Sequence, residues 1–181
     1  QSTLSDSGFR PCPRCPNTVQ PSRQARWTPP SDMRDTTTFD PIAARVRRRQ
    51  PRRRILDFSQ TVRALHIAPA FSCMEIVDTI YYGLMRRDRG KDADDTFIIS
   101  KGHGSLAQYA VLESLGIVSK AELDLYGKPG GRYATHPDYG IPGIEASTGS
   151  LGHGLNLAVG LAAAEKVRQA RVRGSSSSRN P

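Results

Sequence analysis

The chain has 181 residues, the length of one domain with or without tails, and a mean hydropathy of −0.49, which is low for a chain that folds along its whole length. Its net charge is +9, but residues 1–54 hold 12 Arg and 4 Asp, residues 166–181 hold five basic residues and no acid, and residues 55–165 hold 9 basic and 13 acidic residues. Because a basic nucleic-acid-binding domain carries its charge on the folded part, the acidic middle argues against one. No run approaches the roughly 18 apolar residues of a membrane helix, which argues against a membrane protein.

Residues 1–51 are expected to form a disordered Arg/Pro-rich tail. They contain eight prolines, with arginines and serines between them and few aliphatic residues. Such a segment buries too little apolar surface to offset the entropy of ordering its backbone, about 1–2 kcal/mol per residue. Residues 174–181, which include four consecutive serines, are expected to be a second disordered tail. The folded part is therefore expected to span residues 52–173.

The number of cysteines bears on the cellular compartment of the protein and does not indicate a metal site. The chain has three, an odd and small number, which argues against a disulfide scaffold and favours a reducing compartment. We therefore expect a cytoplasmic protein. Cys12 and Cys15 have the spacing of half a zinc ribbon, but four ligands are needed and no second pair exists, so no metal site is predicted from the cysteines.

Two helices are predicted at the start of the folded part. Apolar residues spaced by three and four predict an amphipathic helix over about 52–66, which His66 is expected to end. Pro69 interrupts this pattern. Ser72 and Glu75 then have the spacing of a capping box, which predicts that a second helix begins there.

A strand and three further helices are predicted after them. Residues 96–100 form a short apolar run rich in β-branched residues, typical of a buried strand. The helices are expected over about 106–116, after a capping box of Ser119 and Glu122, and over about 155–172. A loop dense in Gly and Pro spans residues 127–143. The pattern indicates an α/β fold in which helices dominate.

A glycine-rich turn joins the predicted strand to the helix that follows it. Residues 100–105 read SKGHGS and include Lys101 and His103. Proteins of the α/β class bind ligands at the carboxyl ends of strands, and a helix N-terminus favours a phosphate. The alternative is a plain turn with an exposed histidine.

A second glycine-rich turn, STGSLGHG over residues 147–154, opens the last helix. It has neither the glycine spacing of a dinucleotide fingerprint nor the Lys of a P-loop, but it could offer N–H groups and a hydroxyl to a phosphate. Close packing is the alternative explanation. His136 lies in the long loop, where a polar residue is free to be functional or simply exposed, and a helix cap is the alternative explanation for His66.

Three segments together resemble the N-terminal, diphosphate-binding half of transketolase. They read HIAPAFSCMEIVDTIYYGLM, FIISKGHGSLAQYAVLESLG and THPDYGIPGIEASTGSLGHGLNLAVGLAAAEK. Their order and separations also fit, and the resemblance covers about residues 52–168. The SLGHG sequence is similar to the small alpha subunits of two-subunit transketolases.

The resemblance implies a fold, a cofactor and site residues. The fold would be an incomplete thiamine diphosphate-binding fold of the α/β class, helix-rich with few parallel strands. Catalytic roles are implied for His66 near the thiazolium, His103 at the diphosphate and His136 facing the sugar. Contacts with the cofactor are implied for His103, Gly149, Ser150, Leu151, Gly152 and His153.

The resemblance also implies partners and a reaction. The family transfers a two-carbon ketol unit from a ketose to an aldose with thiamine diphosphate and Mg²⁺, and sugar phosphates are its substrates. A pyrimidine-binding (beta) subunit would supply the glutamate that activates the cofactor, in a homo- or hetero-oligomer. The family's Gly-Asp-Gly metal motif does not occur in this sequence, so we expect a truncated chain or fragment that is inactive alone.

Two alternatives remain open at the level of sequence. One is another thiamine diphosphate enzyme of the deoxyxylulose phosphate synthase or dihydroxyacetone synthase type. The other is a non-catalytic binding protein whose basic tails hold nucleic acid or an acidic partner. Trp27 is the one tryptophan among the arginines, so base stacking is not suggested and nucleic acid is not expected.

Overall fold

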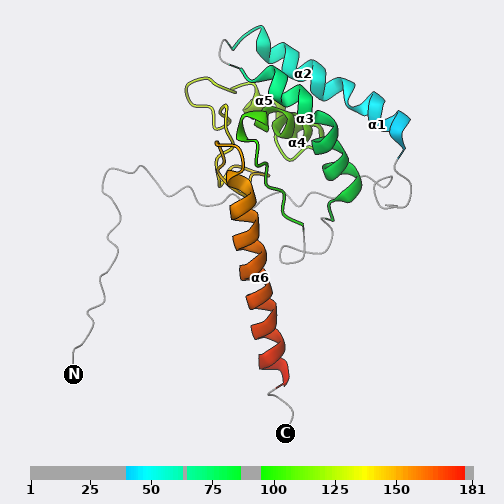
Figure 1. Ribbon diagram of the computed structural model, residues 1–181. Coiled ribbons are helices and arrows are strands. Elements are labelled where there is room, and N and C mark those ends of the chain that lie inside the picture. Colours follow the sequence, from blue (N-terminus) through cyan, green and yellow to red (C-terminus); the bar gives the residue numbers. More distant parts are fainter. Residues whose placement is uncertain (1–39, 63–64, 87–94, 178–181) are drawn as a thin grey trace, which may run out of the picture.

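The computed structural model describes residues 40–62, 65–86 and 95–177, with side chains as far as residue 169. Figure 1 shows α1 to α5 gathered in one bundle, from which α6 projects as a long straight rod. The helices in chain order are α1 (Pro41–Arg47), α2 (Arg49–Ser59), α3 (Ile67–Thr79), the π-helical turn η2 (Ile80–Leu84), the 3₁₀ turn η3 (Gly102–Gly104), α4 (Ser105–Ser114), α5 (Lys120–Leu123) and α6 (His153–Ser177).

Helix α4 lies at the centre of the bundle. Every residue from 105 to 112 is buried, and α4 packs against both α2 and α3. The largest fully buried side chains of the bundle include those of Ile55, Met74, Tyr109, Leu112, Leu123, Tyr126 and Tyr133. The helix predicted over this region is confirmed, and it buries polar Ser105 and Gln108 together with its apolar residues.

The first two helices occupy part of the segment that was expected to be a disordered tail. Residues 41–47 and 49–51 are helical, whereas residues 1–39 lie outside the described residues. The Oδ1 atom of Asp40 accepts hydrogen bonds from the amides of Ile42 (2.8 Å) and Ala43 (3.2 Å), and Pro41 occupies the first helical position. Both features stabilise a helix start. The first described helix thus begins at Pro41, within the segment predicted as a tail.

Arginines of these helices bind the carboxylates of the bundle. Arg47 makes two hydrogen bonds to the buried Asp78, at 3.0 and 2.8 Å, and Arg48 approaches the same carboxylate at 3.3 Å. Arg54 binds Glu113 at 3.0 Å, on the other side of α2. The positive charge assigned to a tail thus belongs in part to ion pairs between helices, because planar guanidinium groups can bridge two carboxylate oxygens at once.

Helix α3 begins earlier than predicted. His66 does not end the preceding helix, which stops at Ser59, but occupies the position just before α3. Pro69 lies within the first turn of α3, where a proline is tolerated because its missing N–H has no helical partner. The predicted capping box of Ser72 and Glu75 is wrong: the Ser72 hydroxyl donates to the Pro69 carbonyl at 2.9 Å.

No strand occurs among the described residues, so the α/β prediction is not confirmed. Residues 96–100 are extended, and Ile99 is buried as expected. Their backbone acceptors are used by other groups: the Ile99 carbonyl accepts from Thr148 Oγ1 at 2.7 Å and the Ser100 carbonyl from the Gly152 amide at 3.3 Å. An extended segment becomes a strand only when a second extended segment pairs with it.

The last two helices agree with the prediction at their starts. The capping box before α5 is confirmed, because the Glu122 amide donates to Ser119 Oγ (3.2 Å) and the Ser119 amide donates to Glu122 Oε2 (3.1 Å). Helix α6 continues to Ser177, so residues 174–177, predicted to be disordered, are helical, and residues 178–181 lie outside the described part. None of the helices described is long and apolar enough to cross a membrane.

Candidate functional site

Three histidines that are far apart in the sequence converge on one place. The ring centroid of His66 lies 5.6 Å from that of His103 and 5.8 Å from that of His136, both in edge-to-face arrangements. They come from the start of α3, from η3 and from the loop between α5 and α6. His66 is exposed, whereas the other two are partly buried. The structure thus brings the three residues predicted as catalytic into one cluster, which we call the histidine cluster.

His103 stands between two glycines because the backbone is closely packed on both sides. A Cβ atom on Gly102 would lie 2.4 Å from the Thr148 carbonyl oxygen, well inside contact distance. A Cβ atom on Gly104 would lie 3.0 Å from the sulfur of Cys73. The Gly-His-Gly turn is therefore pressed between the second glycine-rich turn and α3, which fixes the position of His103.

The second glycine-rich turn packs directly on the first. Thr148 is buried, and its hydroxyl and the Gly152 amide bind the carbonyls of Ile99 and Ser100 respectively. A Cβ atom on Gly149 would meet the His136 ring at 3.9 Å. The two turns and His136 are therefore packed against one another.

The backbone around His136 is held on two sides. The Thr148 amide donates to the Pro137 carbonyl at 3.3 Å, and the hydroxyl of Tyr109 on α4 donates to the His136 carbonyl at 3.0 Å. The hydroxyl of Thr135 lies 3.3 Å from Nδ1 of the His136 ring. These contacts bind the backbone carbonyls of His136 and Pro137 and place the Thr135 hydroxyl beside the His136 ring.

The electrostatics of the cluster favour neutral imidazole at His103. Partial burial lowers the pKa of His103, and the positive charge of Lys101 and the nearby rings of His66 and His136 lower it further. The Lys101 ammonium donates to Ser72 Oγ at 2.7 Å and to the Pro69 carbonyl at 3.2 Å, so it joins the first glycine-rich turn to α3. A neutral imidazole can donate one hydrogen bond and accept another near pH 7.

The remaining residues predicted to bind cofactor lie on the outer side of the second turn. Ser150, Leu151, Gly152 and His153 are all exposed, and Leu151 is 73% exposed. His153 is the first residue of α6 and makes no ring contact with the histidine cluster among the described side chains. The structure therefore joins Gly149 to the cluster but leaves His153 apart from it.

Sequence reasoning missed three supporting residues: Thr148, Ser105 and Tyr109. In the sequence, Thr148 is one hydroxyl of a glycine-rich turn and Tyr109 is one residue of a largely apolar helix. The spacing of Ser105 and Tyr109, four residues apart on one helix, was the available signal that both face the same loop. Their hydrogen bonds to that loop depend on tertiary structure.

The described residues include no group of three or more His, Cys, Asp or Glu side chains that could hold a metal ion. The cluster offers imidazoles and hydroxyls, whereas Mg²⁺ prefers carboxylate, phosphate and water oxygens. These residues fit a cofactor with phosphate and ring groups, and they do not by themselves fit Mg²⁺.

Comparison with known proteins gives these features a context. Residues 51–178 match the model of a family described as transketolase, thiamine diphosphate binding domain. The chain is 38% identical over 122 residues to one of the subunits of the apulose-4-phosphate transketolase of Phocaeicola vulgatus, which is 66% of this chain and 43% of that protein. It is 46% identical over 79 residues to the transketolase of Treponema pallidum, 42% of this chain and 12% of that protein. The chain thus spans less than half the length of these relatives.

Proposed function

Because this chain belongs to the transketolase family of thiamine diphosphate-binding domains, we propose that it contributes the diphosphate side of a site that transfers a two-carbon ketol unit from a ketose to an aldose. Bound thiamine diphosphate would supply an electron sink for the electron pair of the carbon–carbon bond that breaks. The observation that carries the proposal is the convergence of His66, His103 and His136 beside two packed glycine-rich turns. Sugar phosphates are the proposed substrates.

The three histidines have different proposed tasks. His103 donates a hydrogen bond to the diphosphate, since its turn immediately precedes the N-terminus of α4 and its lowered pKa favours a neutral ring with one N–H. His66 and His136 face each other across the cluster, so both can hold or move a proton at a substrate hydroxyl or carbonyl oxygen. Gly149 leaves room beside His136 for the cofactor.

The exposed part of the second turn completes the proposed cofactor contacts. Ser150, Leu151, Gly152 and His153 are accessible at the start of α6, where amides and a hydroxyl can reach a phosphate oxygen. Mg²⁺, which would neutralise the diphosphate, would be held by groups other than the described residues.

A partner chain is part of the proposal. One relative is named as one component of a transketolase made of more than one chain, and this chain covers 43% of that relative's length. We propose that a pyrimidine-binding (beta) subunit, in a homo- or hetero-oligomer, supplies the activating glutamate, and that the chain alone does not turn over substrate. A cytoplasmic location is proposed from the small number of cysteines.

Ion pairs of four arginines count against a nucleic-acid-binding surface over residues 47–54. Arg47, Arg48, Arg52 and Arg54 each make an ion pair with a carboxylate of α3, α4 or the end of α5. Guanidinium groups engaged in this way are not free to neutralise backbone phosphates.

Calorimetric titration of the purified chain with thiamine diphosphate and Mg²⁺ tests the proposal. Binding is expected, and His103→Ala is expected to weaken it at least tenfold, because the diphosphate would lose a hydrogen-bond donor. Lys128→Ala, an exposed change in the long loop, is the matched control and should leave affinity unchanged. Absence of binding, or equal affinity of the wild type and His103→Ala, would contradict the cofactor site. Ketol transfer by the isolated chain would contradict the need for a partner.

A further inference from the structure

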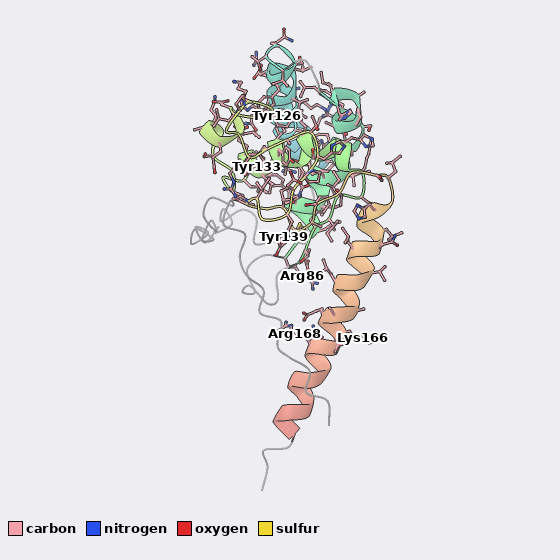
Figure 2. The ribbon with its side chains drawn as sticks, turned by 90° about the vertical axis from the view of Figure 1, so that its left-hand side faces the viewer. Arg86, Tyr126, Tyr133, Tyr139, Lys166 and Arg168 are labelled. Atoms are coloured by element: carbon pink, nitrogen blue, oxygen red, sulfur yellow. The ribbon has the colours of Figure 1, made fainter. Side chains whose placement is uncertain are left out.

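The loop between α5 and α6 carries His136 but contains no helix or strand of its own, so its shape depends on bonds from neighbouring elements. Three side chains of α4 supply such bonds to its backbone carbonyls. Ser105 Oγ donates to Thr135 (3.1 Å), Tyr109 OH to His136 (3.0 Å) and Gln108 Nε2 to Gly143 (3.2 Å). Figure 2 labels Tyr126 and Tyr133, two residues of this loop, in the upper part of the molecule.

These donors are among the most buried polar groups of the chain. Ser105 and Tyr109 are 0% exposed and Gln108 is 1% exposed. A buried donor that loses its acceptor carbonyl has no water to replace the bond, so the three bonds favour one position of the loop over others. Helix α4 is itself surrounded by the core, which makes it a rigid support for the loop.

Tyr109 has the most direct contact with the histidine cluster. We propose that Tyr109 is a positioning residue, which binds the His136 carbonyl and thereby keeps the His136 imidazole facing His66, with Ser105 supporting it one helical turn away. The importance of Tyr109 for catalysis rests on the proposed function. Its effect on the position of the His136 ring does not, and it can be measured in the chain without cofactor.

Two further observations agree with this role. The Tyr109 ring is fixed by edge-to-face contacts with Tyr133 (5.0 Å between centroids) and Tyr126 (6.1 Å). Burial raises the pKa of Tyr109, so its hydroxyl keeps its proton and remains a donor throughout the neutral range. The Thr148 amide donates to the carbonyl of Pro137, the residue after His136. Two consecutive carbonyls of this loop are therefore hydrogen-bonded, that of His136 by Tyr109 and that of Pro137 by Thr148.

Tyr133 provides a matched control within the same aromatic group. It is 1% exposed, and its hydroxyl has no hydrogen-bond partner among the described residues. Tyr109→Phe and Tyr133→Phe both remove one buried hydroxyl from neighbouring rings, but only the first removes a bond to the histidine loop. A general loss of packing would affect both variants in the same way.

The experiment is a comparison of histidine ring signals in the full chain. Four histidines give four sets of ¹H–¹³C ring signals, which single substitutions assign. Tyr109→Phe is expected to shift the signals of His136 and His66 and to weaken the contact between their rings, while the signals of His153 stay in place. Tyr133→Phe is expected to leave all four unchanged. Ser105→Ala is expected to give a smaller shift in the same direction, and it serves as the second variant if Tyr109→Phe does not fold.

Thiamine diphosphate affinity is the second measurement. We expect Tyr109→Phe to lower the affinity about three- to tenfold, the effect of one lost hydrogen bond, and Tyr133→Phe to leave it within about twofold of the wild type. Unmoved His136 signals in both Tyr109→Phe and Ser105→Ala, or equal shifts in Tyr133→Phe, would overturn the positioning role. Shifted His136 signals in a chain that binds no cofactor would support the positioning role and count against the proposed function, so the two failures are distinguishable.

Discussion

Helices α4 and α6 both begin at a Gly-His-Gly sequence, yet one is the centre of the molecule and the other projects from it. Residues 105–112 of α4 are all buried. In α6 the apolar side chains of Leu155, Val159 and Leu161 are 64, 62 and 49% exposed. Figures 1 and 2 show α6 extending away from the bundle, and Figure 2 labels Lys166 and Arg168 on it.

The comparison teaches that local sequence and tertiary packing make separate contributions. Both helices are rich in Ala and Leu, which favour helix without any tertiary contact. Helix α4 is buried because α2, α3 and the long loop surround it, and its polar Ser105 and Gln108 find hydrogen-bond partners there. The described residues provide no comparable cover for α6 beyond its first turn. A mutation in the buried α4 should therefore change stability more than a matched mutation in the exposed α6.

The largest expected effect on stability comes from neutralising a buried carboxylate, in comparison with an exposed one. Asp78 is 0% exposed and is held by Arg47 and Arg48, whereas Glu165 of α6 pairs with Arg168 on the surface. Asp78→Asn leaves two partly buried guanidinium groups without their carboxylate and is expected to lower the free energy of unfolding by about 3 kcal/mol. Urea unfolding followed by circular dichroism measures it. The control Glu165→Gln should leave the midpoint in place, and equal effects would show that the Asp78 site is solvated.

A leucine pair makes the same comparison for apolar burial. Leu112 is 0% exposed in α4 and Leu155 is 64% exposed in α6. Leu112→Ala is expected to lower the free energy of unfolding by about 2–5 kcal/mol, because it removes transfer energy and leaves a cavity. Leu155→Ala is expected to stay within about 0.5 kcal/mol. Urea unfolding of both variants at equal protein concentration tests this. A large effect of Leu155→Ala would mean that α6 is covered in solution.

Two glycines extend the comparison to the backbone. Gly102 faces the Thr148 carbonyl, so Gly102→Ala must separate the two glycine-rich turns and should abolish thiamine diphosphate binding. Gly160 has nothing within 4 Å of an added Cβ atom. Gly160→Ala is therefore expected to stabilise α6 by about 1 kcal/mol through helix propensity, which slows its amide exchange roughly fivefold. Normal cofactor binding by Gly102→Ala would contradict the close contact between the two glycine-rich turns. Unchanged amide exchange in Gly160→Ala would contradict the open space around Gly160.

The smallest expected effect is the pH dependence from His103. Its pKa is lowered in the folded chain, so between that value and about 6.5 the unfolded chain binds more protons than the folded one. Stability should then fall as pH decreases through about 6.5 and level off below the folded pKa. Urea unfolding over a pH series that brackets this range measures the slope, which His103→Gln should remove. Lys101→Met should raise the pKa of His103 and reduce the slope, and an unchanged slope in both variants would contradict the assignment.

Several features could be predicted from sequence because they depend on neighbours in the chain. The capping box of Ser119 and Glu122, the helix after Gly104 and the start of the last helix are all local. Their hydrogen bonds and propensities act over three or four residues. The family resemblance was also correctly identified, because its motifs are short and ordered along the chain.

Other features could not be predicted because distant groups decide them. Arg47 is part of a charged run in the sequence, and only the buried Asp78, 31 residues away, makes it an anchor for α1. Residues 96–100 have the composition of a strand, but the hydroxyl of Thr148 and the amide of Gly152 take up carbonyls that strand pairing would use. His66 was expected to end a helix, whereas it stands before α3 beside two other histidines.

The sequence by itself determined where the chain turns, which segments can be helical and which family motifs it carries, because glycine, proline and capping residues act locally. Only the tertiary structure decided which histidines meet, which arginines are ion-paired and which of two similar helices is buried. Those outcomes depend on contacts between residues 27 to 70 positions apart, such as Tyr109 with His136, Arg47 with Asp78 and Arg54 with Asp124. Their energies are realised only when the whole bundle has excluded water from around them.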